Sequence, residues 1–184
     1  MKVVAFTGAG ISKAAGIPTF EDTPGVKEKF SVEFRETHPV EYYEAKLERA
    51  KMFEGKEPTK AHKVLAELDI PIITMNIDGL HKKAGSRLVY EIHGNYLDDN
   101  IVLYGEEILY RDEALNLLIK TAKQAEAEGE DSVLLVIGTS MQTAFAYILV
   151  HVANQFGMKI HYINENADEE VPKFLKDKVF LHKV

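Results

Sequence analysis

Short apolar runs rich in β-branched residues alternate along this chain with longer stretches of helical period. The run at 133–137 reads Val-Leu-Leu-Val-Ile and lacks the alternation of polar and apolar residues that marks a strand with one solvated face. Unbroken runs of this kind are typical of parallel strands that helices cover on both faces. The sequence therefore predicts an α/β fold built on a Rossmann-like, doubly wound parallel sheet.

The same patterning divides the chain into expected elements. Strands are expected at 3–6, 71–74, 88–92, 101–103, 133–137, 159–163 and 179–181. Helices are expected at 12–15, 39–54, 59–68, 111–128 and 144–156. The first strand ends near Phe6 and the next begins near Ile70, whereas a complete β-α-β unit needs only about 30 residues. We therefore expect 21–69 to form a small inserted helical lobe, with 1–20 and 70–184 forming the Rossmann-like domain.

Composition excludes several classes of protein. The chain has 184 residues, no cysteine and a formal net charge of −7. Without cysteine there is no disulfide, no cysteine-ligated zinc, no iron-sulfur cluster and no cysteine nucleophile. The charge and the lack of a basic block disfavour nucleic acid as the main partner. No apolar run approaches the ~20 residues that cross a bilayer, and no signal peptide is visible, so we expect a soluble, cytoplasmic protein without a membrane partner.

A glycine turn follows the first expected strand. Thr7–Ser12 reads Thr-Gly-Ala-Gly-Ile-Ser and opens a helix, so backbone N–H groups could approach a phosphate at the positive end of that helix. Lys13 stands where the dinucleotide fingerprint needs Gly or Ala, and no acidic residue ends a second strand at the usual distance. A standard hydride-transferring dehydrogenase is therefore disfavoured. A tight turn without any ligand is the alternative interpretation.

Polar residues also follow three later strands. Asn76 and Asp78 come after the second, His93 ends the next, and Gly138–Ser140 follow another. The carboxyl ends of parallel strands share one edge of the sheet, which is where open α/β sheets bind ligands. We expect these groups to converge on one crevice with the glycine turn. Helix capping and turn formation are the alternative roles for Asn76 and Asp78.

At these positions the sequence resembles the sirtuin family of NAD-dependent protein deacylases, and the resemblance covers nearly the whole chain. The matching segments, in the family's order, are Gly8–Ser12, Gly16–Phe20, Asn76–His81, Ala84–Gly85, His93–Gly94, Tyr104–Glu106, Gly138–Ser140 and Ile163–Asn164. The resemblance implies NAD as the cofactor and an acyl-lysine protein or peptide as the acceptor substrate. It also implies transfer of the acyl group to ADP-ribose after nicotinamide has been expelled.

The resemblance assigns a role to individual residues. The implied cofactor-binding residues are Gly8, Ala9, Gly10, Ser12, Phe20, Asn76, Ile77, Asp78, Gly138, Thr139, Ser140 and Asn164. Tyr104, Gly105 and Glu106 would contact the acyl-peptide, and Asn76 and His93 would be catalytic. These residue types suit the chemistry, because a carboxamide can face a sugar carbon that develops positive charge. A histidine with an ordinary pKa of about 6.5 can act as a base near neutrality.

The sequence departs from the family's pattern at several places. Most sirtuins carry a four-cysteine zinc module after the His-Gly pair, but only Asn95–Asn100 fill that position here, so we expect no metal. Glu21 replaces an arginine that contacts the cofactor, and Met75 replaces a glutamine whose hydrogen bonds a thioether cannot supply. With the zinc module absent, one wall of the peptide cleft is missing, and a homo-oligomeric partner is a hypothesis for what supplies it.

Three other functions remain open at this point. An NAD glycohydrolase or ADP-ribosyltransferase would use water or another nucleophile in place of the acyl oxygen. A non-catalytic module that binds NAD or ADP-ribose is favoured by Glu21 and Met75 but disfavoured by Asn76, Asp78 and His93. A serine hydrolase using Ser140 ranks third, because the segment 138–142 lacks the second glycine of the nucleophile elbow.

Overall fold

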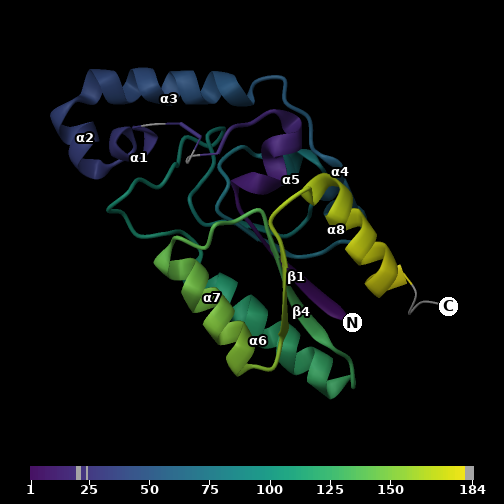
Figure 1. Cartoon of the computed structure of the whole chain (residues 1–184). Coiled ribbons are helices and arrows are strands. Elements are labelled where there is room, and N and C mark those ends of the chain that lie inside the picture. Colours follow the sequence, from purple (N-terminus) through teal and green to yellow (C-terminus); the bar gives the residue numbers. More distant parts are fainter. Residues whose placement is uncertain (20–21, 24, 181–184) are drawn as a thin grey trace.

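The computed structural model describes residues 1–19, 22–23 and 25–180 (Figure 1). The expectations made for Phe20 and Glu21 therefore lie outside the described residues. Within the part of the chain that is described, no helix is both long enough and apolar enough to cross a membrane.

A five-stranded sheet with the order β3-β2-β1-β4-β5 forms the centre of the molecule, and all of its neighbouring strands are parallel. Its strands are β1 (Lys2–Thr7), β2 (Ile72–Thr74), β3 (Val89–Glu91), β4 (Ser132–Ile137) and β5 (Lys159–Ile163). The central strand β1 pairs with β2 on one side and with β4 on the other. The chain therefore reverses its winding direction at β1, and the predicted doubly wound α/β fold is confirmed.

The central strands β1, β2 and β4 are buried on both faces because two layers of helices cover the sheet (Figure 1). Val4 and Phe6 point to the face covered by α6 (Arg111–Ala127) and α7 (Ala144–Gln155). Their neighbours Val3 and Ala5 point to the face covered by α4 (Lys60–Glu67) and α8 (Ala167–Leu175). This two-sided burial explains why the strand sequences are unbroken apolar runs.

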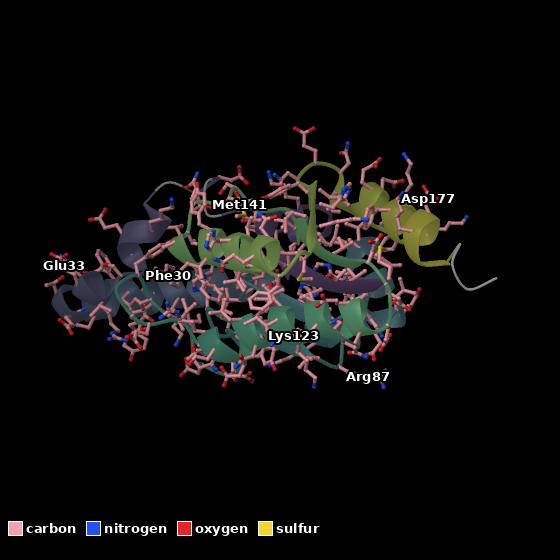
Figure 2. The ribbon with its side chains drawn as sticks, turned by 90° about the horizontal axis from the view of Figure 1, so that it is seen from below. Phe30, Glu33, Arg87, Lys123, Met141 and Asp177 are labelled. Atoms are coloured by element: carbon pink, nitrogen blue, oxygen red, sulfur yellow. The ribbon has the colours of Figure 1, made fainter. Side chains whose placement is uncertain are left out.

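A small helical lobe lies beyond one end of the sheet (Figure 1). It contains α1 (Val26–Lys29), α2 (Val32–Thr37) and α3 (Pro39–Phe53). The lobe has a core of its own, formed by Val26, Phe30, Tyr42, Ala45 and Leu103. Figure 2 shows the labelled Phe30 and Glu33 towards one end of the molecule and Asp177 at the other.

The prediction of a strand is wrong at two places. Residues 101–103 do not join the sheet, because Ile101 and Leu103 pack into the lobe core and Tyr104 makes a single bridge to Ser31. Residues 179–180 lie in a π-helical turn, Lys176–Phe180, that follows α8, and Leu181 lies outside the described residues.

Several helices were not expected from the sequence. They are α1, α2, α8 and the short α5 (Leu80–Lys83). The helix expected at 12–15 is a 3-10 helix, η1, that begins at Ala9 and ends at Ala15. The other four expected helices are found within two residues of their expected ends.

Candidate functional site

A cavity of about 1200 Å³ lies between the sheet and the lobe, at the carboxyl ends of the strands. Every described residue that was predicted to bind or to act lines this cavity. They are Gly8, Ala9, Gly10, Ser12, Asn76, Ile77, Asp78, His93, Tyr104, Gly105, Glu106, Gly138, Thr139, Ser140 and Asn164. The cavity lies at the topological switch point between β1 and β4, where the order of the strands reverses. Open α/β sheets bind ligands at this position.

The glycine turn after β1 packs directly against the turn after β4. A Cβ atom on Gly10 would lie 2.6 Å from Gly138 Cα, so a side chain cannot be accommodated there. The Gly8 N–H donates to Ile137 O (2.9 Å) and the Gly10 N–H donates to Gly138 O (2.8 Å). These two N–H groups are therefore bonded to the end of β4 and to the turn that follows it, and are not directed at the cavity.

Other donors line the same part of the cavity. Among the described residues, the backbone N–H groups of Ala9 and Ser140 have no hydrogen-bond partner, and both residues line the cavity. The Thr139 N–H donates to Asn164 Oδ1 (3.3 Å), which ties the β4 turn to the residue after β5. An anionic group at this end would thus meet Ala9 N–H and the N–H and hydroxyl of Ser140.

Three buried polar side chains that line the cavity form a hydrogen-bond network. Ser12 Oγ donates to Asp78 Oδ2 (2.6 Å), and Asn76 Nδ2 donates to both Ser12 Oγ (3.2 Å) and Asp78 Oδ2 (3.3 Å). The Leu80 N–H donates to Asp78 Oδ1 (3.0 Å), so the carboxylate also caps the start of α5. Helix capping and a place in the candidate site were alternative roles for Asp78 in the sequence analysis. The structure gives it both positions, since it accepts from the start of α5 and lines the cavity.

This network fixes which way the Asn76 amide faces. An ionised carboxylate only accepts hydrogen bonds, so the Asn76 atom beside Asp78 must be the amide nitrogen. Within the described part of the chain Asn76 Oδ1 then has no donor. Asn76 lines the cavity, and its carbonyl oxygen is the atom left to face a ligand.

His93 lies in the turn two residues after β3, half-buried on the cavity wall. Burial lowers the pKa of its imidazole below the ordinary value of 6.5, because the charged form loses solvation. Its backbone carbonyl accepts from the Val102 N–H (2.9 Å), and within the described residues no protein group bonds to its ring. The imidazole is therefore neutral near neutrality and available to take a proton.

The segment predicted to bind peptide connects the cavity to the lobe. The Tyr104 N–H donates to Phe30 O (2.9 Å), and Tyr104 O accepts from the Val32 N–H (3.1 Å). Glu106 accepts from Arg35 Nη1 (3.1 Å) and from the Leu103 N–H (2.8 Å). The carboxylate of Glu106 is thus occupied within the protein and holds this segment in place.

Sequence reasoning missed the basic residues of the cavity. They are Lys13, Lys27, Arg49 and Arg111. Arg49 is 5% exposed, and its Nη2 donates to Pro18 O (3.2 Å). It lies on the buried stripe of α3 with Tyr42, Ala45 and Phe53. A charged residue on an otherwise apolar helical stripe is the sequence signal that could have found it.

Asn95–Asn100, the segment in which no metal was expected, form a tight turn. Asn100 Oδ1 accepts from the Asn95 N–H (2.8 Å), and Asn95 Oδ1 accepts from the Leu97 N–H (2.9 Å). Asn95 Nδ2 donates to Glu91 Oε1 (2.5 Å). Side-chain hydrogen bonds close this turn, and the described residues contain no group of three or more acidic or histidine side chains arranged to hold a metal.

Comparison with known proteins gives a consistent set of relatives. The sequence model of the Sir2 family matches residues 8–99. An NAD-dependent protein deacylase of Aeropyrum pernix is 32% identical over 88% of this chain and 80% of its own length. An NAD-dependent protein deacylase of Leptospira interrogans is 31% identical over 96% of this chain and 88% of its own length.

Solved structures agree with the sequence matches. A structure of Sir2 with a p53 peptide and NAD+ superposes with a TM-score of 0.79 at 25% identity, covering 96% of this chain and 92% of the other. The matched lengths show that this chain is similar to those proteins across both the sheet and the lobe.

Proposed function

Because this chain belongs to the Sir2 family, we propose that it is an NAD-dependent protein-lysine deacylase. The reaction would break the nicotinamide-ribose bond of NAD and transfer the acyl group of an acyl-lysine to ADP-ribose. One observation carries the proposal: the Ser12, Asn76 and Asp78 network and the neutral imidazole of His93 line the same cavity. A nucleotide-binding module that did no chemistry would need neither a free imidazole nor an oriented carboxamide there.

The cavity fits NAD by both size and chemistry. Its volume of about 1200 Å³ exceeds the roughly 300–1,000 Å³ of ordinary ligand pockets, which leaves room for an acyl-lysine chain beside the cofactor. Ala9 N–H and Ser140 would hold the pyrophosphate, and Asn164 would lie on the adenosine side. Asp78 would accept from the nicotinamide amide, in addition to the protein donors it already has.

Bound NAD would supply a labile bond between nicotinamide and a sugar carbon, and the acyl oxygen of the substrate would replace nicotinamide at that carbon. Asn76 would orient its carbonyl oxygen towards the positive charge that develops at the carbon, since Ser12 and Asp78 hold its amide nitrogen. His93 would accept a proton from a ribose hydroxyl, because burial keeps its imidazole neutral.

The acyl-peptide is proposed to bind between the lobe and the sheet, beside Tyr104 and Gly105. Both residues line the cavity, and Tyr104 is half-exposed. The division into a helical lobe and a Rossmann-like domain is part of the proposal. We end the lobe before α4 and not at residue 69 as expected, since Ala61 and Leu65 of that helix pack in the sheet core. We also propose that a second copy of the chain supplies the missing wall of the peptide cleft and that the protein acts in the cytoplasm.

The deciding experiment measures nicotinamide release from NAD with and without an acetyl-lysine peptide. We expect release that depends on the peptide and equals the amount of lysine deacetylated. Equal release with and without peptide would replace the deacylase with an NAD glycohydrolase. Calorimetric binding of ADP-ribose with no release under either condition would leave only a binding module.

A further inference from the structure

A buried chain of hydrogen bonds connects α5 to the backbone of Asn76. His81 Nε2 lies 2.9 Å from Thr7 Oγ1, Thr7 Oγ1 donates to Thr74 Oγ1 (2.8 Å), and Thr74 Oγ1 accepts from the Asn76 N–H (3.0 Å). His81 is 2% exposed, and Thr7 and Thr74 are 0% and 1% exposed. None of these three residues lines the cavity, so they can affect a ligand only through other residues, and the chain that their side chains form ends at the backbone of Asn76.

The count of protons along this chain fixes the tautomer of His81. A hydroxyl has one proton, and Thr7 gives its proton to Thr74. The Thr7 oxygen must therefore accept from His81, which carries its proton on Nε2 and a lone pair on Nδ1. Burial lowers the pKa of His81 well below 6.5 and keeps the ring neutral in this state.

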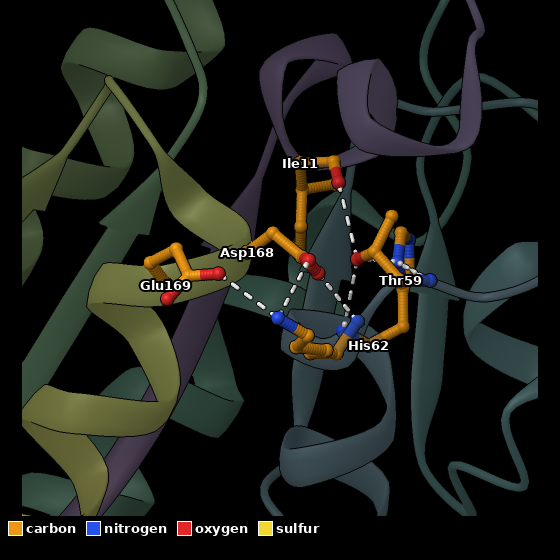
Figure 3. A network of polar contacts seen from close by, with 6 residues as sticks. Ile11, Thr59, His62, Asp168 and Glu169 are labelled. Atoms are coloured by element: carbon orange, nitrogen blue, oxygen red, sulfur yellow. Dashed lines mark hydrogen bonds and ion pairs between the residues drawn. The ribbon is translucent and has the colours of Figure 1, made fainter.

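A second buried imidazole lies next to the first. The rings of His62 and His81 have centroids 4.6 Å apart. The Thr59 N–H donates to His62 Nδ1 (3.3 Å), so the His62 proton lies on Nε2. The Thr59 hydroxyl lies 2.7 Å from the same Nδ1 and 3.3 Å from Ile11 O, which links this ring to the glycine turn (Figure 3).

The other ring nitrogen of each histidine has no hydrogen-bond partner among the described residues. These nitrogens are His62 Nε2 and His81 Nδ1, and both are fully buried. One of them is a donor and the other is an acceptor. An apolar residue at either position would cost less desolvation, so filling space does not account for a histidine at position 81. The chain through Thr7 and Thr74 provides that reason.

We infer that His81 is a positioning residue for Asn76, acting through Thr7 and Thr74 on the Asn76 backbone. The Asn76 amide nitrogen is held by Ser12 and Asp78, whereas its backbone is held by Thr74. The two sets of bonds together define where the carbonyl oxygen lies in the cavity. A displacement of about 1 Å at a reacting group can reduce the rate of the chemical step by about a hundredfold. This inference rests on the proposed function only for its kinetic readout.

The test compares variants that remove a link with variants that retain it. His81→Leu removes the donor at similar volume, and Thr7→Val removes the relaying hydroxyl. His81→Gln retains an N–H near Nε2, and Thr7→Ser retains the hydroxyl. We expect the kcat of peptide-dependent nicotinamide release to fall at least about tenfold in His81→Leu and Thr7→Val, with KM for NAD within about threefold. His81→Gln and Thr7→Ser should recover most of the loss.

A second readout needs no turnover. Because Thr74 accepts from the Asn76 N–H, exchange of that amide with deuterium, measured by NMR without NAD, should accelerate in His81→Leu and not in His81→Gln. Leu118→Ala, a buried position of α6, controls for stability. It should lower Tm while leaving the kcat per folded molecule unchanged, and the exchange of Asn76 relative to its neighbours should also be unchanged.

Two results would overturn the inference. One is an Asn76 amide that exchanges alike in His81→Leu and in the unaltered protein. The other is an equal loss in the Leu and Gln variants, which would indicate that the ring only fills space. If no nicotinamide is released by the unaltered protein but Asn76 exchange depends on His81, the proposed function fails and the positioning role stands.

Discussion

At the scale of single residues, the site depends on groups whose state is set by burial. Asn76 presents an oxygen to the cavity because an obligate acceptor, Asp78, holds its nitrogen. His93 is neutral because the protein removes solvent from its ring. The sequence predicted which residue types would meet, but the direction of each hydrogen bond needed the structure.

The role of His93 can be tested by the pH dependence of the reaction. Burial lowers the pKa of its imidazole below 6.5, so the base stays unprotonated to a lower pH than a free histidine would. The kcat/KM for NAD should therefore be constant near neutrality and fall by half at a pH below 6.5. Rates measured from pH 5 to 8 check this.

His93→Ala supplies the matched variant. It should reduce turnover by about a hundredfold or more while ADP-ribose binding, measured by calorimetry, stays within a few-fold. Loss of binding together with a lower Tm would assign His93 to the core instead.

At the scale of elements, the two glycine turns act as one unit. Gly138 has φ +59°, and a Cβ on it would lie 2.6 Å from Gly10 Cα. Gly129 has a similar φ of +65° but no atom within 4 Å of such a Cβ. Substitutions at Gly129 and Gly138 therefore distinguish two contributions to the loss of stability, the strain of a left-handed backbone and a steric clash.

We expect Gly129→Ala to lower the free energy of unfolding by about 1 kcal/mol, the cost of the left-handed conformation alone. Gly138→Ala should cost at least about 2 kcal/mol more, because the two turns must separate. It should also abolish ADP-ribose binding. Denaturant unfolding and calorimetry measure both effects, and equal costs for the two variants would show that the turns are not in close contact in solution.

The turn at 95–100 leads to a further expectation for an element. Hydrogen bonds of Asn95 and Asn100 close it, so we expect that the turn does not need a metal ion and that a chelator does not destabilise it. Incubation with EDTA should leave Tm unchanged, as followed by circular dichroism. A drop in Tm that zinc reverses would contradict this.

The accuracy of the sequence-based expectations varies with how each element is stabilised. Strands β1 and β4 and helices α3, α6 and α7 are long and strongly patterned, and all five were found close to their expected limits. Ile101 and Leu103 pack into the lobe core. The apolar pattern of so short a segment is the same for a loop packed in this way and for a strand paired in a sheet. Helix α8 contains Pro172, which lacks an N–H and is a signal against a helix. Its acidic first turn and buried Val171 and Leu175 outweigh that signal.

At the scale of the whole molecule, the candidate site was predictable because parallel strands deliver their carboxyl ends to one edge. Motifs more than a hundred residues apart, such as Gly8 and Gly138, were therefore expected to meet, and their turns are in contact. Arg49 and the buried histidine pair were not predicted to contribute. Their positions depend on how the lobe and α4 pack, and short-range patterns carry little information about such packing.

The buried histidine pair also predicts how the stability of the whole molecule depends on pH. Burial lowers the pKa of His62 to about 4, although Asp78 and Asp168 oppose the shift, and it lowers the pKa of His81 well below 6.5. In the unfolded chain both groups return to about 6.5, so below that pH the unfolded state binds protons that the native state does not. The stabilisation is therefore complete above pH 6.5 and is lost as the pH falls from 6.5 towards 4.

Each buried histidine should contribute up to about 1.4 kcal/mol per pH unit to the decrease in the free energy of unfolding over that range. Urea unfolding between pH 7.5 and 4.5 measures the slope. His62→Gln removes one titrating ring, so its slope should be shallower by about that amount even if the variant is less stable at every pH. His151→Gln, on the exposed side of α7, removes a histidine outside the pair and should keep the slope of the unaltered protein. If His62→Gln has the same slope as His151→Gln, the acid sensitivity comes from carboxylates and not from the buried rings.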